Sequence, residues 1–157
     1  GLATLIKSMK FIDNKNIKLI IAGEFYEPIE KYLNIIKNLG LDDKIIIKNE
    51  FLDSKMIRDF ICASDLIIQP YIKASQSGIT PLCYFYETPS VVSNIDGLKE
   101  IILKDKSGTT FDKTPKSLST AIIESLDKQK NNNYILNIKR SKKNYTWLSF
   151  VKELEEL

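Results

Sequence analysis

The fold is decided by residues 64–102, which read SDLIIQPYIKASQSGITPLCYFYETPSVVSNIDGLKEII. The stretch opens with a short apolar strand, DLIIQP (65–70), and Pro70 stops it. A loop of small and polar residues follows, then a helical segment, TPLCYFYE (80–87), and a second apolar strand, SVVSN (90–94). Two apolar strands connected through a helix are typical of a parallel β-α-β unit.

The same alternation of strands and helices continues on both sides of this unit. Further apolar strands are predicted at 16–24 and 44–49, and a short edge strand at 107–112. Helices are predicted at 2–12, 28–39, 54–61 (capped by Asp53 or Ser54), 99–103, 118–126, 134–143 and 147–157, with Asn131–Asn133 in a loop. Because the strands are continuously apolar, we expect both of their faces to be buried. The sequence therefore predicts a single α/β domain over 1–157, with a parallel sheet flanked by helices.

Composition narrows the possible chemistry. The 157 residues are 43% hydrophobic and 27% charged, with a net charge of +3, as in globular domains. No apolar run approaches the ~20 residues that cross a bilayer. The chain contains no histidine, which excludes His-based acid–base catalysis, His-dependent nucleophiles and most zinc sites. Cys62 and Cys83 lie in apolar stretches without metal-ligand spacing, so we expect both to be reduced, buried and inert, in a cytoplasmic protein.

Ligands of doubly wound parallel sheets bind beyond the carboxyl ends of the strands. This rule selects the loops at 23–25, 49–52, 70–78 and 93–97. The third is the most informative, because a helix is expected to begin between Ser77 and Thr80. Its first N–H groups and positive dipole end favour an anion such as phosphate, and Gly78 lets that anion approach the backbone. The alternative is an ordinary strand-to-helix turn with a serine cap.

Three further features have ordinary structural explanations. Glu24 after Gly23 is a loop carboxylate, a kind of residue that is usually solvated. The turn at 96–97 before Glu100 resembles a normal helix start. The stretch 128–143 holds six basic residues and no acidic one. We expect it to be a solvated helix face without a nucleic-acid partner, and a membrane-surface or nucleic-acid patch is the alternative.

Residues 64–102 strongly resemble the C-terminal domain of group 1 (family 4) glycosyltransferases. The matches, in order and spacing, are Ala63-Ser64-Asp65, Pro70, Ser77-Gly78, Thr88-Pro89-Ser90-Val91 and Asp96-Gly97-x-x-Glu100. Flanking stretches are similar too: GLATLIKSM (1–9), LIIAGEF (19–25), FLDSKMIRDFICASD (51–65) and NYTWLSFVKEL (144–154). The resemblance covers nearly the whole chain and implies a Rossmann-like domain, the C-terminal half of a GT-B fold.

The resemblance also implies a function. Such enzymes are retaining glycosyltransferases of the hexosyltransferase type, which transfer a sugar from a nucleotide diphosphate sugar to a glycan or lipid-linked acceptor. They usually need no metal or other cofactor, and this domain holds the donor. No catalytic residue is assigned. The diphosphate is expected at Ser77, Gly78 and Ile79, the base or ribose near Gly23, Glu24, Glu50, Phe51 and Leu52, and the sugar near Ser75 and Gln76.

The sequence departs from the family pattern where many members carry a Glu-x7-Glu pair. Ala74 and Leu82 stand at those positions, as in a subgroup with an SQSG loop, which leaves the donor and its ribose contacts open. The family's phosphate-binding Arg and Lys precede the glycine that matches Gly1. We therefore expect a fragment of a longer protein, inactive without its N-terminal acceptor domain. The alternative is a non-catalytic Rossmann-like module that binds a nucleotide or sugar.

The family's usual setting is polysaccharide or glycolipid synthesis. The resemblance therefore places the full-length protein in the cytoplasm, with peripheral association at the inner face of a membrane.

Overall fold

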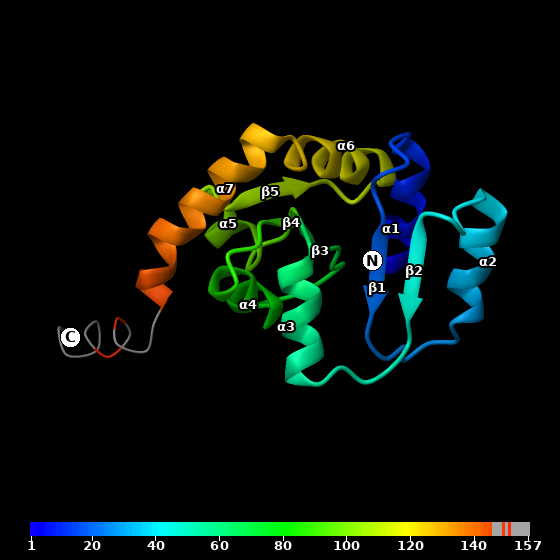
Figure 1. The fold of residues 1–157 in the computed structure, drawn as a ribbon, viewed down its shortest axis with the longest axis horizontal. Helices are drawn as coiled ribbons and strands as arrows, with labels where there is room; N and C mark the ends of the chain where they lie inside the picture. The colour runs from blue at the N-terminus through cyan, green and yellow to red at the C-terminus, as the bar shows by residue number, and fades with distance from the viewer. Residues whose placement is uncertain (146–148, 150, 152–157) are drawn as a thin grey trace.

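The computed structural model describes residues 1–145, 149 and 151, in which helices alternate with strands (Figure 1). The strands are β1 (Leu19–Ala22), β2 (Ile45–Lys48), β3 (Ile67–Gln69), β4 (Ser90–Ser93) and β5 (Gly108–Phe111). The α-helices are α1 (Leu2–Ser8), α2 (Glu30–Leu39), α3 (Ser54–Ala63), α4 (Ile79–Phe85), α5 (Lys99–Asp105), α6 (Pro115–Ser125) and α7 (Lys128–Ser141). The 3-10 helices η1 (Met9–Phe11) and η2 (Lys142–Tyr145) follow α1 and α7.

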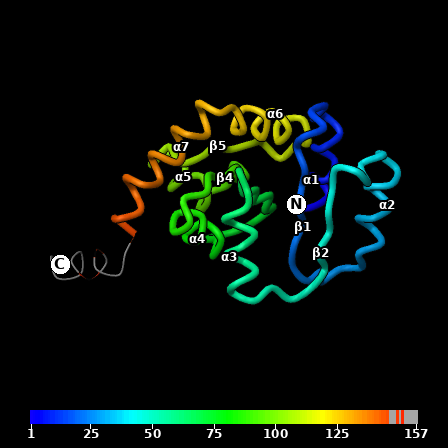
Figure 2. Tube along the Cα trace, viewed as in Figure 1, coloured from blue at the N-terminus to red at the C-terminus, as the bar shows by residue number. Residues whose placement is uncertain are grey.

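The strands pair in parallel, which confirms the predicted fold class. β1 pairs with β2, with Leu19 opposite Ile45, and β4 lies between β3 and β5, with Val91 opposite Ile68. The hydrogen-bonded strands therefore form two groups, β1-β2 and β3-β4-β5, rather than one continuous ladder. In Figure 2, the trace of β1 and β2 lies apart from that of β4 and β5. β5 pairs on one side only in the described chain, as predicted for an edge strand.

Helices cover both faces of β4. The first core cluster joins α1, α2 and α6 to the strands, and it includes the fully buried Ile6 and Val91. The second joins α4, α5 and α7 to β4 through Tyr84, Val92 and Ile102. Because neighbouring residues of a strand point to opposite faces, Val91 and Val92 divide β4 between these two clusters.

Local sequence signals fix where several helices begin and end. Asp53 caps α3, since its carboxylate accepts a hydrogen bond from the N–H of Met56 at 2.7 Å. Gly40 ends α2 in the left-handed region, with φ 63°, as predicted for a C-terminal stop. Helix α4 begins at Ile79, inside the predicted interval. These starts and stops were therefore predictable from short-range chemistry.

The prediction of a loop at Asn131–Asn133 is wrong, because these residues lie inside α7. The helix starts early because the Asp127 carboxylate accepts a hydrogen bond from the N–H of Lys130 at 3.0 Å. The side-chain amide of Asn131 donates to the carbonyl of Asp65 at 3.0 Å, so it anchors the helix to the end of α3. The polar composition of residues 131–133 does not indicate this tertiary contact.

Two burial predictions are also wrong. Cys62 is exposed, because α3 turns it away from the buried side that carries Ile61. Ile20 and Ile46 are register partners on β1 and β2, yet they are 47% and 45% exposed. Cys83 is buried, as predicted. One face of β1 and β2 is therefore not covered by other elements, although the apolar sequence of these strands predicts burial of both faces.

The helix predicted at 147–157 falls on residues of which only 149 and 151 are described, so it stays a prediction. Within the described ranges, no helix combines the length and the apolar character needed to cross a membrane.

Candidate functional site

The carboxyl ends of β1 and β3 meet at the start of α1. Leu2 lines a pocket together with Gly23, the residue after β1. Gly1 packs directly against the carbonyl of Pro70, the residue after β3. Because β2 and β4 run parallel to these strands, their ends lie at the same edge. The loops that follow the strands therefore gather where parallel α/β sheets bind ligands.

The loop 70–78 enters α4 through a polar turn. Ser77 Oγ accepts a hydrogen bond from the N–H of Ile79 at 3.2 Å, so the serine cap considered from the sequence is present. Thr80 Oγ1 donates to Oε1 of the buried Gln69 at 3.1 Å. This second bond ties the first turn of α4 to the last residue of β3. The positive end of the α4 dipole therefore lies at this loop, in a fixed position.

Apolar contacts occupy the two positions where the resemblance implies glutamates. Ala74 is half-buried and packs against the second core cluster. Leu82 is half-buried within α4. Gly78, between them, has an ordinary helical φ of −65°, and a side chain at this position would meet open space. The site thus offers backbone and hydroxyl groups here in place of a pair of carboxylates.

Gly97 holds the loop after β4 against the loop after β3. Its φ is 77°, and a Cβ there would overlap the carbonyl oxygen of Ser75. Glycine is therefore required by both the backbone conformation and the close approach. Ser75 and Gln76 remain exposed on the other side of this contact. The sequence predicts a turn at Gly97, but no local signal indicates the contact of this residue with Ser75.

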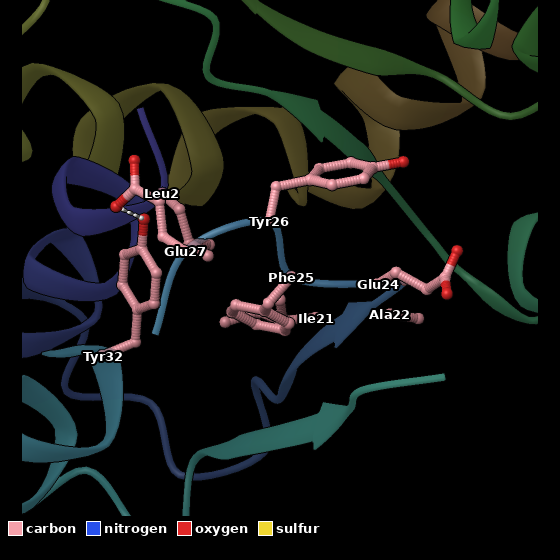
Figure 3. Close-up of a pocket in the computed structure, with 9 residues that line it drawn as sticks. Leu2, Ile21, Ala22, Glu24, Phe25, Tyr26, Glu27 and Tyr32 are labelled. Carbon is pink, nitrogen blue, oxygen red and sulfur yellow. Dashed lines mark hydrogen bonds between the residues drawn. The ribbon is translucent and has the colours of Figure 1, made fainter. Parts of the chain in front are cut away.

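A pocket of about 320 Å³ lies beside the end of β1 (Figure 3). Glu27 Oε2 accepts hydrogen bonds from Lys31 Nζ at 2.8 Å and from the Tyr32 hydroxyl at 3.3 Å. The hydrogen bond from Lys31 lowers the pKa of the Glu27 carboxyl, which keeps it anionic at neutral pH. The ring of Phe25 packs against that of Tyr32, with centroids 5.5 Å apart. The lining consists of Leu2, Ile21, Ala22, Gly23, Glu24, Phe25, Tyr26, Glu27 and Tyr32.

Gly23 and Glu24 are the residues of this pocket that sequence reasoning had selected for a ligand. In Figure 3, the side chain of Glu24 points away from Glu27, so the two carboxylates do not form a pair. Phe25 belongs to the same predicted loop, whereas the sequence does not predict Glu27 and Tyr32 as site residues. The sequence predicts Tyr32 on the apolar face of a helix, and nothing in it indicates that α2 brings the Tyr32 hydroxyl to Glu27.

The loops after β1 and β2 are joined by one hydrogen bond, which Asn49 Oδ1 accepts from the N–H of Phe25 at 3.2 Å. Glu50 and Phe51 follow it and are exposed, whereas Leu52 is half-buried. These three predicted site residues lie on the adjacent loop and do not line the pocket of Figure 3. The residues Ser75 to Ile79, on the loop after β3, do not line it either.

The site can bind through backbone N–H groups, hydroxyls, carboxylates and aromatic rings. In the parts of the chain that the structure describes, no three Cys, Asp or Glu side chains cluster as ligands for a metal ion. Burial raises the pKa of the Cys83 thiol to about 11, so this thiol stays protonated at neutral pH. Its chemistry is therefore that of a core residue rather than a nucleophile.

Comparison with known proteins gives the family. A family model described as "Glycosyl transferases group 1" matches residues 1–142. The chain belongs to this family. Among the relatives of this chain is the uncharacterized glycosyltransferase MJ1607 of Methanocaldococcus jannaschii, 27% identical over 160 residues. That alignment covers 98% of this chain and 40% of the relative, so the chain spans less than half of that protein's length.

Solved structures of glycosyltransferases share the fold of this chain. HepE of Anabaena, in complex with UDP-glucose, superposes with a TM-score of 0.83 at 17% identity, over 100% of this chain and 45% of that one. The C-terminal domain of LpcC from Francisella tularensis, a group 1 glycosyl transferase, gives 0.82 at 16% identity, over 94% and 80%. At these identities the likeness shows the fold alone, which is the Rossmann-like half of a GT-B glycosyltransferase.

Proposed function

We propose that this chain is the donor-binding domain of a retaining glycosyltransferase, which transfers a sugar from a nucleotide diphosphate sugar to a glycan or lipid-linked acceptor. The observation that carries the proposal is the turn at 77–79, which starts α4 at the carboxyl edge of β3. The family membership of residues 1–142 supports the transferase activity. The related fold of HepE, solved with UDP and with UDP-glucose, supports a nucleotide-sugar ligand.

The proposed role of the turn is to bind the diphosphate. Negative charge develops on the departing diphosphate during sugar transfer, and fixed N–H dipoles stabilise such charge. Ser77, Gly78 and Ile79 bring a hydroxyl and backbone amides to the positive end of α4. The bond from Thr80 to Gln69 keeps that end in place before the donor arrives. In this proposal the backbone, rather than a metal ion, stabilises the leaving group.

The remaining parts of the donor are assigned to neighbouring loops. The base and ribose are assigned to Gly23 and Glu24 together with the adjoining loop at 50–52, since the hydrogen bond from Phe25 to Asn49 holds these loops together. The transferred sugar is assigned to the exposed Ser75 and Gln76. The acceptor is assigned to parts of the protein beyond this chain.

The test is calorimetry and thermal unfolding of the chain with UDP, GDP, ADP and inorganic pyrophosphate. A diphosphate at a hundredfold excess over its Kd should add about 2.7 kcal/mol of stability. For a domain of this size, that corresponds to a rise in Tm of about 5–10 °C. We expect one nucleoside diphosphate to be preferred, which would also identify the base.

Two variants distinguish an effect on ligand binding from an effect on the stability of the fold. Gly78→Val should abolish the rise in Tm without lowering Tm in the absence of ligand, because the glycine has ordinary φ and open space beside it. Thr120→Val, on the exposed side of α6, is the matched control and should keep the ligand response. If neither this chain nor the longer polypeptide that contains it responds to any of these ligands, the donor-site proposal is wrong.

A further inference from the structure

Helix α7 lies across the amino edge of β3, β4 and β5, on the side of the molecule away from β1 and β2 (Figure 1). The Asn131 amide donates to a carbonyl two residues before β3, and the Asn137 amide donates to the carbonyl of Lys106, two residues before β5, at 2.9 Å. Lys142, which follows the helix, pairs with Glu87, three residues before β4. The candidate ligand site lies at the opposite, carboxyl edge of these strands, so the two surfaces are separate.

The positive charge of the chain is concentrated on α7 and η2. The stretch 128–143 holds six basic residues and no acidic one, which exceeds the net charge of +3 of the whole chain, so the other residues are acidic overall. Three of the six pair with carboxylates of the domain. Among the described residues, Lys128, Arg140 and the nearby Lys106 form no ion pair. A cationic surface on an otherwise acidic domain favours an anionic partner.

Large apolar side chains are exposed on the same elements. Leu136 on α7 and Leu103 on α5 are 51% and 52% exposed, and Phe85 at the end of α4 is 70% exposed. The three helices meet at Tyr145 of η2, whose ring lies 5.2 Å from a tyrosine ring of α4 and whose hydroxyl donates to Asp105, the last residue of α5, at 2.7 Å. The resulting surface, the α7 face, combines cations with apolar groups; it comprises Phe85, Leu103, Lys106, Leu136 and Arg140.

The exposed leucines distinguish between the anionic partners that such a surface could bind. Proteins bind nucleic acids through cations and through aromatic rings that stack on the bases, and aliphatic side chains have no comparable partner there. At a membrane surface, Lys and Arg lie among the headgroups, while Leu and Phe enter the boundary of the acyl chains. The α7 face offers both classes of side chain, which favours a membrane over a nucleic acid and over a merely solvated helix.

We propose that the α7 face binds the surface of a bilayer that contains anionic phospholipid. Lys106 and Arg140 meet the headgroup phosphates, and Phe85, Leu103 and Leu136 enter the bilayer boundary. Because the α7 face lies at the amino edge of the sheet, the loops at the carboxyl edge point away from the bilayer and stay accessible. The proposal is independent of the ligand that those loops bind.

Co-sedimentation with lipid vesicles tests the proposal directly. The chain is mixed with vesicles of phosphatidylcholine alone, or with about one third phosphatidylglycerol to make the surface anionic. We expect the anionic vesicles to bind at least about tenfold more tightly, and about 0.5 M NaCl to release most of the protein, because salt screens the charges. Equal binding to both vesicles, or binding to neither, would overturn the proposal. Tighter binding to a single-stranded RNA oligonucleotide than to the vesicles would overturn it in favour of a nucleic acid.

Two double variants of equal charge localise the binding surface. Lys106→Gln with Arg140→Gln should weaken binding to anionic vesicles at least about tenfold, since both cations lie on the α7 face. Lys55→Gln with Lys113→Gln removes the same charge from exposed positions that follow β2 and β5, at the carboxyl edge, and should weaken binding less than about threefold. Equal losses in the two double variants would show that overall charge, rather than the α7 face, governs binding, which contradicts the proposal.

A pair of phenylalanine variants tests the apolar contribution without a change of charge. Phe85→Ser should weaken binding to anionic vesicles about fivefold or more, because the bilayer loses an inserted ring. Phe51→Ser is the matched control, since Phe51 is 73% exposed but lies in the loop after β2 at the opposite edge, and it should bind vesicles as the parent chain does. Thermal unfolding verifies that both variants are folded. Unchanged vesicle binding by a folded Phe85→Ser variant would contradict insertion of the α7 face into the bilayer.

Discussion

Two glycines in neighbouring loops of the candidate site have opposite structural roles. Gly97 has φ 77° and lies against the carbonyl of Ser75, so it fixes the distance between the loops after β3 and β4. Gly78 has φ −65° and no neighbour in the direction of a side chain. The first glycine is required by the protein itself, whereas the second leaves space that a ligand could use.

The substitution Gly97→Ala should therefore destabilise the fold by about 2 kcal/mol or more, since it adds both backbone strain and a steric overlap. Gly78→Ala should be neutral or stabilise by up to about 1 kcal/mol, because alanine lowers the entropy of the unfolded chain without a clash. Urea unfolding of the two variants measures the difference. Equal losses of stability would show that the contact between Gly97 and Ser75 does not hold the loops together.

At the scale of elements, apolar runs and local caps predicted most of the fold. The strands at Ile67–Gln69 and Ser90–Ser93 lie inside the predicted segments, and α3 begins at the predicted cap. These features depend on residues close in sequence. The early start of α7 depends partly on Asn131 reaching Asp65, a contact that no local pattern encodes.

The candidate site was less predictable than the fold, for the same reason. The loops were found because the carboxyl ends of parallel strands share one edge. The pocket of Figure 3 was not found, because Leu2, Phe25 and Tyr32 converge on it from three separate elements. The exposure of Ile20 was also unpredictable, since its apolar surroundings indicate burial and only the three-dimensional arrangement shows the open space between β1 and β3 that it lines.

Helix α7 and the following η2 are attached to the rest of the domain through ion pairs with Glu87. The Glu87 carboxylate lies 2.5 Å from Lys142 Nζ and 3.4 Å from Lys139 Nζ. The hydrogen bond from Lys142, aided by Lys139, lowers the pKa of the Glu87 carboxyl. Part of the basic stretch at 128–143 therefore pairs within the domain.

The lowered pKa of Glu87 predicts how acid affects stability. A carboxyl whose pKa is lower in the folded state contributes stability above its unfolded pKa, near 4.3, and loses it as the pH falls through the folded value. Glu87→Gln should therefore flatten the fall in Tm below about pH 4.3 and leave its slope near pH 7 unchanged. Glu30→Gln, an exposed position on α2, is the control. An unchanged acid limb in Glu87→Gln would show that the pair with Lys142 does not persist in solution.

At the scale of the whole molecule, the first core cluster makes the two groups of strands one unit. It contains Leu19 and Ile45 from β1 and β2 as well as Val91 and Phe111 from β4 and β5. Helix α1 connects them, since Ile6 is completely buried in this cluster. Packing therefore unites strands that no ladder joins in the described chain.

Ile6→Ala should accordingly weaken both groups together. The truncation leaves a cavity in the shared core and should cost about 2–5 kcal/mol, whereas Ile123→Ala on the exposed side of α6 should cost less than about 0.5 kcal/mol. Hydrogen exchange followed by mass spectrometry should show β2 and β5 losing protection by similar factors in Ile6→Ala. Loss confined to β1 and β2 would mean that the two groups unfold separately. Loss in both would show that the helical layer, rather than a continuous sheet, makes folding cooperative.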